Sequence, residues 1–134
     1  MLMDKYNRNR VPLFHDRILL FVFTFFLGAF FGSLLYAQNL KEAGKKNYIA
    51  ATIIASLLYN YFALRILAGL SVDNILVRLF LANGIAAWLL AWVCWNYHFK
   101  NITLYDRRSI WVPLLAIILV YGFFITINMI MAKK

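Results

Sequence analysis

GAFFGSLLYAQNLKEAGKK, residues 28–46, is the stretch that decides the fold predicted from this sequence. It begins with a Gly-x-x-x-Gly pair, Gly28 and Gly32, inside an apolar run, and it ends in a polar, basic turn. Small residues one helical turn apart let another helix approach closely in lipid. Gly44 lies where a helix that continues beyond the apolar run needs a left-handed C-cap. We therefore expect one helix over residues 18–43 and, after a tight turn, a second helix antiparallel to it.

The composition indicates a membrane protein. Of the 134 residues, 64% are hydrophobic and only 14% are charged, and the mean hydropathy of +0.73 exceeds that expected for soluble domains. The charged residues lie between apolar runs long enough to cross a bilayer. The sequence therefore predicts an all-α, polytopic membrane protein, a four-transmembrane-helix bundle in one domain over residues 1–134. The expected parts are a basic lead-in over 1–17 and helices at about 18–43, 48–70, 75–97 and 110–132.

Polar residues recur along the second predicted helix. Thr52, Ser56 and Asn60 follow one another at intervals of four residues, so they share one face. Such groups either join helices by hydrogen bonds or line a path for a solute, and packing is the more common role. Arg65 is the one charge well inside a predicted span, which makes it a candidate functional residue. Its alternatives are a buried ion pair and a side chain that reaches the membrane surface beside Tyr61.

A second narrow face of mostly small residues follows in the third predicted helix. It contains Asn83 and Ala87, and continues through Ala91, Cys94 and His98. Cys94 on such a face indicates packing rather than a nucleophile. Asp73, or Ser71 beside it, is expected to cap this helix at its start. Asp73 is also the acidic residue nearest in sequence to Arg65 and Arg78, so it is a candidate partner for either.

Two segments, FFGSLLYAQNLKEAGKKN at 30–47 and WNYHFKNITLYDRRSIWVPL at 95–114, carry a likeness to a known group. The chain resembles small bacterial four-helix integral membrane proteins, a group without an assigned biochemical role. The resemblance covers about half of the chain and implies a fold and a bacterial membrane location, but no activity. The residues that carry it are Gly32, Asn39, Leu40, Lys41, Gly44, Lys45, Trp111, Pro113 and Leu114.

The basic residues give a weak prediction of orientation. Four spans would place both termini on one side, with eight Lys and Arg residues there against six opposite. This bias favours cytoplasmic termini in a bacterial inner membrane, and it leaves open insertion in both directions. The first apolar core, residues 18–37, is longer than that of a signal peptide, so we expect it to be retained. The formal net charge of +9 is spread over several loops, so the bilayer, not a nucleic acid, is the expected partner.

No constellation of reactive residues is apparent. No Asp or Glu lies deep in a predicted span, and no metal-ligand cluster, nucleotide-binding loop or nucleophile–base pair occurs at a usable spacing. We therefore expect neither an enzyme nor a cofactor. The first prediction is a homo-oligomeric or partner-binding membrane subunit of the accessory or immunity kind, packed through Gly28, Gly32, Ser56 and Ala87. The alternative is a small channel or carrier for an ion or small polar solute, lined by Thr52, Ser56, Asn60, Asn83 and Asn128 with Arg65 at one mouth.

Overall fold

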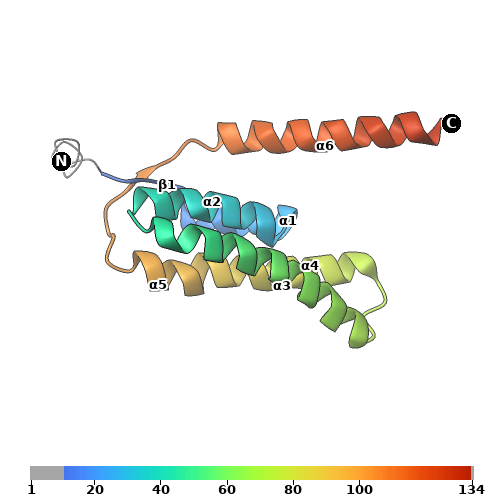
Figure 1. The fold of residues 1–134 in the computed structure, drawn as a ribbon, viewed down its shortest axis with the longest axis horizontal. Coiled ribbons are helices and arrows are strands. Elements are labelled where there is room, and N and C mark those ends of the chain that lie inside the picture. Colours follow the sequence, from blue (N-terminus) through green and yellow to red (C-terminus); the bar gives the residue numbers. More distant parts are fainter. Residues whose placement is uncertain (1–10, 134) are drawn as a thin grey trace.

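The computed structural model describes residues 11–133 and is mostly helical (Figure 1). Three stretches are long and apolar enough to cross a membrane: Lys46–Gly69, Ile75–Phe99 and Trp111–Ala132. The helical prediction is thereby confirmed, but a bundle of four spans is not. The elements in chain order are β1 (Leu13–Phe14), α1 (Arg17–Leu27), α2 (Ala29–Glu42), the 3₁₀ turn η1 (Lys46–Tyr48), α3 (Ile49–Gly69), α4 (Ile75–Trp88), the π-helix η2 (Leu89–Cys94), α5 (Trp95–Phe99), β2 (Asp106–Arg107) and α6 (Trp111–Ala132).

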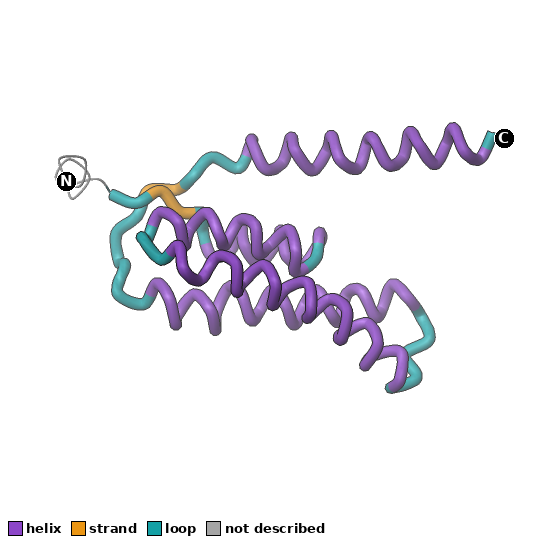
Figure 2. The backbone as a smooth tube through the Cα atoms, viewed as in Figure 1, coloured by secondary structure: helices purple, strands orange, loops and turns teal. Residues whose placement is uncertain are grey.

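The single helix predicted over 18–43 is wrong. The chain reverses at Gly28, whose φ of +96° is a conformation that favours glycine, and α1 and α2 form an antiparallel hairpin (Figure 2). Gly32 packs directly against Thr24 across the hairpin. At its open end, the His15 N–H donates to the Asn39 side-chain oxygen at 2.7 Å, and the Asn39 amide donates to the His15 carbonyl at 2.8 Å.

Helix length explains the difference in topology. At 1.5 Å per residue, α1 is about 16 Å long and α2 about 21 Å long. Each is shorter than the hydrocarbon core of a bilayer, which is about 30 Å thick. A hairpin of this size therefore enters and leaves at the same end of the bundle. The small residues that predicted contact between separate helices instead close this hairpin on itself.

The open end of the hairpin is joined to the start of α6. β1 pairs in parallel with β2, in the register Leu13↔Asp106 and Phe14↔Arg107. The Arg108 N–H also donates to the Phe14 carbonyl at 2.8 Å. The largest buried side chains gather at this end, including Phe14, Leu20, Tyr36, Leu40 and Phe99. We call it the strand end of the bundle.

The other helices pack around the hairpin to different extents. α3 lies against α2, and α4 lies against α1. α6 begins at the strand end, has no buried residue, and ends at the opposite end of the bundle (Figure 1). Gly44 has a φ of +73° just after α2, as its predicted cap role requires. The predicted cap at Ser71 or Asp73 is wrong, because Asn74 accepts from the backbone N–H groups of residues 76 and 77 at the start of α4.

Candidate functional site: two grooves beside the hairpin

The first candidate site is a groove of about 400 Å³ between α3 and the continuous rod α4–η2–α5. Small side chains line it: Ala51 and Ala55 on α3, Ala86 on α4 and Ala29 at the start of α2. Ala51 and Ala55 are exposed although they lie one helical turn apart on the groove. A surface of this kind permits close approach of a second helix backbone. We call it the alanine groove.

The wall of the alanine groove contains the π-helix η2. The Tyr36 hydroxyl lies 2.7 Å from the Cys94 carbonyl and 2.6 Å from Nδ1 of His98. If the single hydroxyl proton is given to the carbonyl, Nδ1 of His98 must donate to the tyrosine oxygen. Nε2 then carries a lone pair, and it is buried without a hydrogen-bond partner. Short π-helical segments are frequent at functional sites, and Cys94 at the end of this one lines the groove together with His98 of α5.

Aromatic and basic groups close the alanine groove at the strand end. The rings of Tyr48 and Tyr97 meet His98 edge to face, with centroids 4.9 Å and 4.8 Å away. The Lys45 ammonium donates to the His98 carbonyl. The turn between α2 and α3 is therefore tied to the end of the rod.

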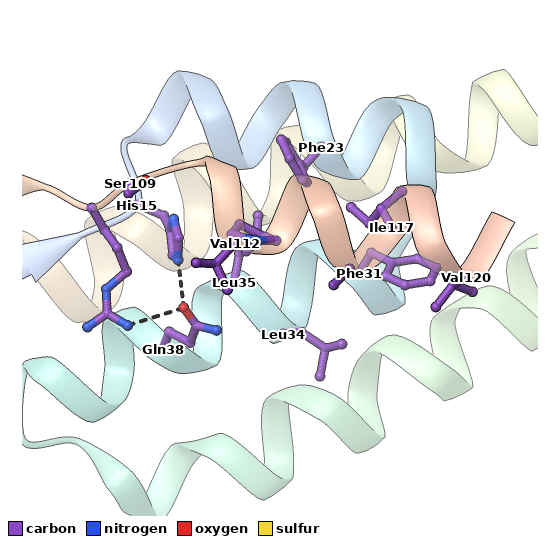
Figure 3. Close-up of a pocket in the computed structure, with 13 residues that line it drawn as sticks. His15, Phe23, Phe31, Leu34, Leu35, Gln38, Ser109, Val112, Ile117 and Val120 are labelled. Carbon is purple, nitrogen blue, oxygen red and sulfur yellow. Dashed lines mark hydrogen bonds between the residues drawn. The ribbon is translucent and has the colours of Figure 1, made fainter. Parts of the chain in front are cut away.

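The second candidate site is a larger cleft, of about 620 Å³, between the α1–α2 hairpin and the first half of α6 (Figure 3). We call it the hairpin cleft. Its apolar walls come from both sides, whereas its strand end is polar. The wall residues are Phe23, Phe31, Leu34, Leu35, Val112, Pro113, Ala116, Ile117 and Val120, and the polar residues are His15, Gln38, Arg108 and Ser109.

The polar end of the hairpin cleft is a connected network. Gln38 Oε1 lies 2.7 Å from Nε2 of His15 and accepts from the Arg108 guanidinium at 3.2 Å. Arg108 also forms an ion pair of 2.8 Å with Glu42. Because Gln38 presents its oxygen to both groups, His15 carries its proton on Nε2. Its Nδ1 is buried and has no hydrogen-bond partner.

Burial and the nearby charge keep His15 neutral. Burial lowers the pKa of the His15 imidazole below its usual value, and the positive charge of Arg108 lowers this pKa further. The hydrogen bond to Gln38 acts in the opposite direction and raises the pKa. The imidazole therefore serves as a neutral donor that holds Gln38 in place beside the guanidinium.

The predicted residues Asn60 and Asn83 are brought together at the tip of the hairpin. Both line a cavity of about 290 Å³ that also touches Gly28. The Asn83 amide donates to the Phe25 carbonyl at 3.1 Å, so it satisfies a backbone group left free where α1 ends. A Cβ added to Gly28 would lie 3.6 Å from Oδ1 of Asn83. Asn83 therefore supports the reversal of the chain.

The other polar residues predicted for a pore are bonded within the protein. The Ser56 hydroxyl lies 2.9 Å from that of Ser33 in α2. Thr52 donates to the Tyr48 carbonyl at 2.7 Å, and Asn128 donates to the Phe124 carbonyl at 2.8 Å. These contacts are helix packing and backbone bonding, and they do not form one polar path through the bundle.

The charged candidates lie at the surface. Arg65 is exposed, and its guanidinium carbon lies 4.9 Å from the centroid of the Tyr61 ring. This position fits the alternative in which its side chain reaches the membrane surface. Asp73 is exposed in the loop before α4, and the ion pairs within residues 11–133 join Arg107 to Asp16 and Arg108 to Glu42 instead. Ala87 is fully buried in the rod.

Sequence reasoning missed the network of His15, Gln38 and Arg108. His15 is separated from Gln38 by 23 residues, and Gln38 from Arg108 by 70. No local pattern connects residues so far apart, and only the hairpin and the β1–β2 pairing bring them together. Among the described residues 11–133, no group of three His, Cys, Asp or Glu side chains could hold a metal ion.

No model of a protein family matches the sequence, and no curated protein or solved structure matches it.

Proposed function

We propose that this protein is a non-enzymatic subunit of a membrane complex, and that a transmembrane helix of a second copy lies in its alanine groove. The observation that carries this proposal is the exposed pair Ala51 and Ala55, which faces Ala86 across an open groove. In lipid, helices gain little from the hydrophobic effect, so close packing over small side chains supplies much of the association energy.

The small residues that the sequence predicted as contacts between subunits instead make contacts within one copy of the chain. Gly32 packs on Thr24, Ser56 bonds Ser33, and Ala87 is buried. These contacts leave Ala51 and Ala55 as the exposed small residues of α3 that line the alanine groove. The proposed contact surface is therefore the alanine groove and not the Gly-x-x-x-Gly pair.

The same chain offers a helix that could fill such a groove. α6 has no buried residue, and a Cβ added at Gly122 would meet nothing within 4 Å. Thr126 lies one turn after Gly122 and donates to its carbonyl at 2.7 Å. This face of α6 is therefore narrow, and its hydroxyl group already has a hydrogen-bond partner. Both properties suit close contact with another helix.

Substitution within the groove tests the proposal. The double variant Ala51→Leu and Ala55→Leu should reduce an oligomer to monomer, as measured by native mass spectrometry from mild detergent and by crosslinking in membranes. Ala68→Leu is the matched control, because Ala68 is exposed on α3 and does not line the groove. A wild-type monomer, or an oligomer that the double variant leaves intact, would reject the role.

The distribution of positive charge supports an orientation. We propose that the strand end faces the cytoplasm in a bacterial inner membrane, since Lys and Arg concentrate on that side of membrane proteins. Because the hairpin returns to its own side, three crossings remain, and the chain ends lie on opposite sides rather than on the same side. The strand end carries Arg17, Lys41, Lys45, Lys46, Lys100, Arg107 and Arg108, and the opposite end carries Arg65, Arg78 and Lys133.

The channel or carrier alternative has less support. Ser56, Thr52 and Asn128 are bonded within the protein, and Arg65 lies at the surface. The cavity beside Asn60 and Asn83 is a separate space at the hairpin tip.

A further inference from the structure

We propose that the hairpin cleft binds one anionic phospholipid from the leaflet at the strand end, with an acyl chain between the hairpin and α6 and its phosphate at Arg108. This site is separate from the alanine groove, so it goes beyond the proposed subunit role. Three features carry the proposal: the shape of the walls, the charge at the polar end and the hydrogen-bond donors that remain free there.

The walls suit a flexible hydrocarbon chain. Bulky side chains such as Phe23, Phe31 and Leu34 project into the cleft from the hairpin, and Val112, Ile117 and Val120 face them from α6 (Figure 3). A second helix needs small residues at its contact, and the alanine groove has them. The hairpin cleft has an irregular apolar surface of about 620 Å³, which lies within the size range of small-molecule sites.

The polar end is placed where a lipid headgroup would lie. His15 and Gln38 stand at the open end of the hairpin, and Arg108 and Ser109 immediately precede α6. The cleft therefore has a polar rim at the strand end and an apolar slot beyond it. A phospholipid in that leaflet has the same order, with its headgroup at the surface and its acyl chains beneath. Basic pockets between transmembrane helices on the cytoplasmic side are known to bind acidic headgroups.

Donors for a phosphate remain free in this network. A guanidinium has five N–H donors, and Arg108 uses one nitrogen toward Gln38 and another toward Glu42. Arg107 stands beside it with a side chain that is 80% exposed, and its carboxylate contact to Asp16 is long, at 3.8 Å. The Ser109 side-chain oxygen accepts from the Trp111 N–H, so its own proton is available to donate.

Charge favours an anionic headgroup over a zwitterionic one. Glu42 partly neutralises Arg108 in the free protein, but a phosphate can bind the remaining donors in the plane of the guanidinium. Arg107 precedes Arg108 and lines the neighbouring pocket with it, so it adds a second positive charge near this end of the cleft. His15 contributes by position, because its bond to Gln38 Oε1 directs that oxygen to Arg108 and holds the guanidinium at the mouth of the cleft.

The test uses the full chain in nanodiscs that contain equal amounts of phosphatidylcholine and phosphatidylglycerol, followed by native mass spectrometry of the released protein. The wild type should retain one phosphatidylglycerol molecule in preference to phosphatidylcholine. Arg108→Gln should lower that retention about fivefold, the effect expected for one basic residue near an anionic lipid. Ala116→Phe, which fills the apolar slot, should abolish retention of either lipid at this site.

Three further variants separate a site from general attraction and from misfolding. Lys46→Gln removes a charge at the same end outside the cleft, and it should leave retention unchanged. Glu42→Gln removes the carboxylate that competes for Arg108, and it should raise retention. Ala55→Leu changes only the alanine groove, and it should not alter lipid binding.

Equal retention of the two lipids by the wild type would overturn the proposal. The same conclusion would follow if Lys46→Gln lost as much lipid as Arg108→Gln, or if Glu42→Gln reduced retention as a disrupted fold would.

Discussion

Thr24 and Gly32 face each other across the hairpin so closely that a Cβ on Gly32 would lie 2.8 Å from the Cβ of Thr24 and closer still to its hydroxyl oxygen. The Thr24 hydroxyl donates to the Leu20 carbonyl at 2.6 Å, so the side chain cannot rotate away without losing that bond. The contact holds α1 and α2 together near the reversal at Gly28. Because of this contact, the Gly-x-x-x-Gly pair packs against its own hairpin and not against a second copy.

Adding a methyl group at Gly32 should therefore destabilise the hairpin. Gly32→Ala should lower the free energy of unfolding by about 1–3 kcal/mol, the usual cost of overpacking, as measured by thermal denaturation in mild detergent. Gly69→Ala is the matched control at the end of α3, where a Cβ meets nothing within 4 Å, and it should be neutral or slightly stabilising. Equal melting temperatures for the two variants would contradict this packing.

Asn39 should be required to close the open end of the hairpin. Its side chain accepts from the His15 N–H and donates to the His15 carbonyl, and both residues are fully buried. Asn39→Leu leaves two buried backbone groups without partners, at a cost of about 1–3 kcal/mol each. The variant should unfold at lower denaturant concentration than Gln38→Leu, which removes bonds only from side chains. A smaller effect for Asn39→Leu would show that β1 stays in place without it.

Stability should fall in mild acid because of His15. Burial and Arg108 lower its folded-state pKa, so the unfolded chain takes up a proton first, near its ordinary pKa of about 6.5. The stabilisation is complete above that pH and is lost as the pH falls toward the lowered folded-state pKa. The melting temperature should thus decrease between about pH 7.5 and pH 5.5.

The variant His15→Gln isolates this contribution. It should show a shallower decrease than the wild type over the same range, although its stability at pH 7.5 is also reduced. An unchanged slope would assign the acid sensitivity to another group, with His98 the next to test by the same substitution.

The proposed orientation predicts a labelling pattern. In a Cys94→Ser background, Lys46→Cys and Arg107→Cys should react with a membrane-impermeant maleimide only after the cytoplasm is opened. Asp73→Cys and Lys133→Cys should react from the periplasm in intact cells. Val11→Cys, which precedes the hairpin, should be labelled from the same side as Lys46→Cys. Labelling of these two positions from opposite sides would restore four crossings and reject the re-entrant hairpin. Labelling of one position from both sides would indicate insertion in two directions.

Local sequence was sufficient for several features of this protein. Apolar length predicts helices wherever backbone groups must be satisfied without water, so the stretches that end at Gly69, Phe99 and Ala132 were expected. Gly44 was expected to take a left-handed conformation, since a helix end before a short turn favours glycine. The position of Arg65 near a helix end indicated that its charge could reach the surface.

The hairpin could not be predicted in the same way. Gly28 and Gly32 have the same spacing whether they lie in one straight helix or on either side of a reversal, and both arrangements bury small residues against a neighbour. The reversal depends on Asn83, which bonds the Phe25 carbonyl, and on Asn39, which bonds His15. These partners are 58 and 24 residues apart along the chain.

The sequence by itself thus determined that the chain is helical, apolar and basic at the ends of its helices. Those properties depend on the side-chain composition and spacing of each segment. Only the tertiary structure decided that Gly28 reverses the chain, so that the first predicted span is a short hairpin, and that His15, Gln38 and Arg108 meet at one cleft. Those outcomes depend on contacts between segments that are distant in sequence. A few buried hydrogen bonds and the absence of a Cβ at Gly32 favour one packing over others that local sequence patterns allow equally well.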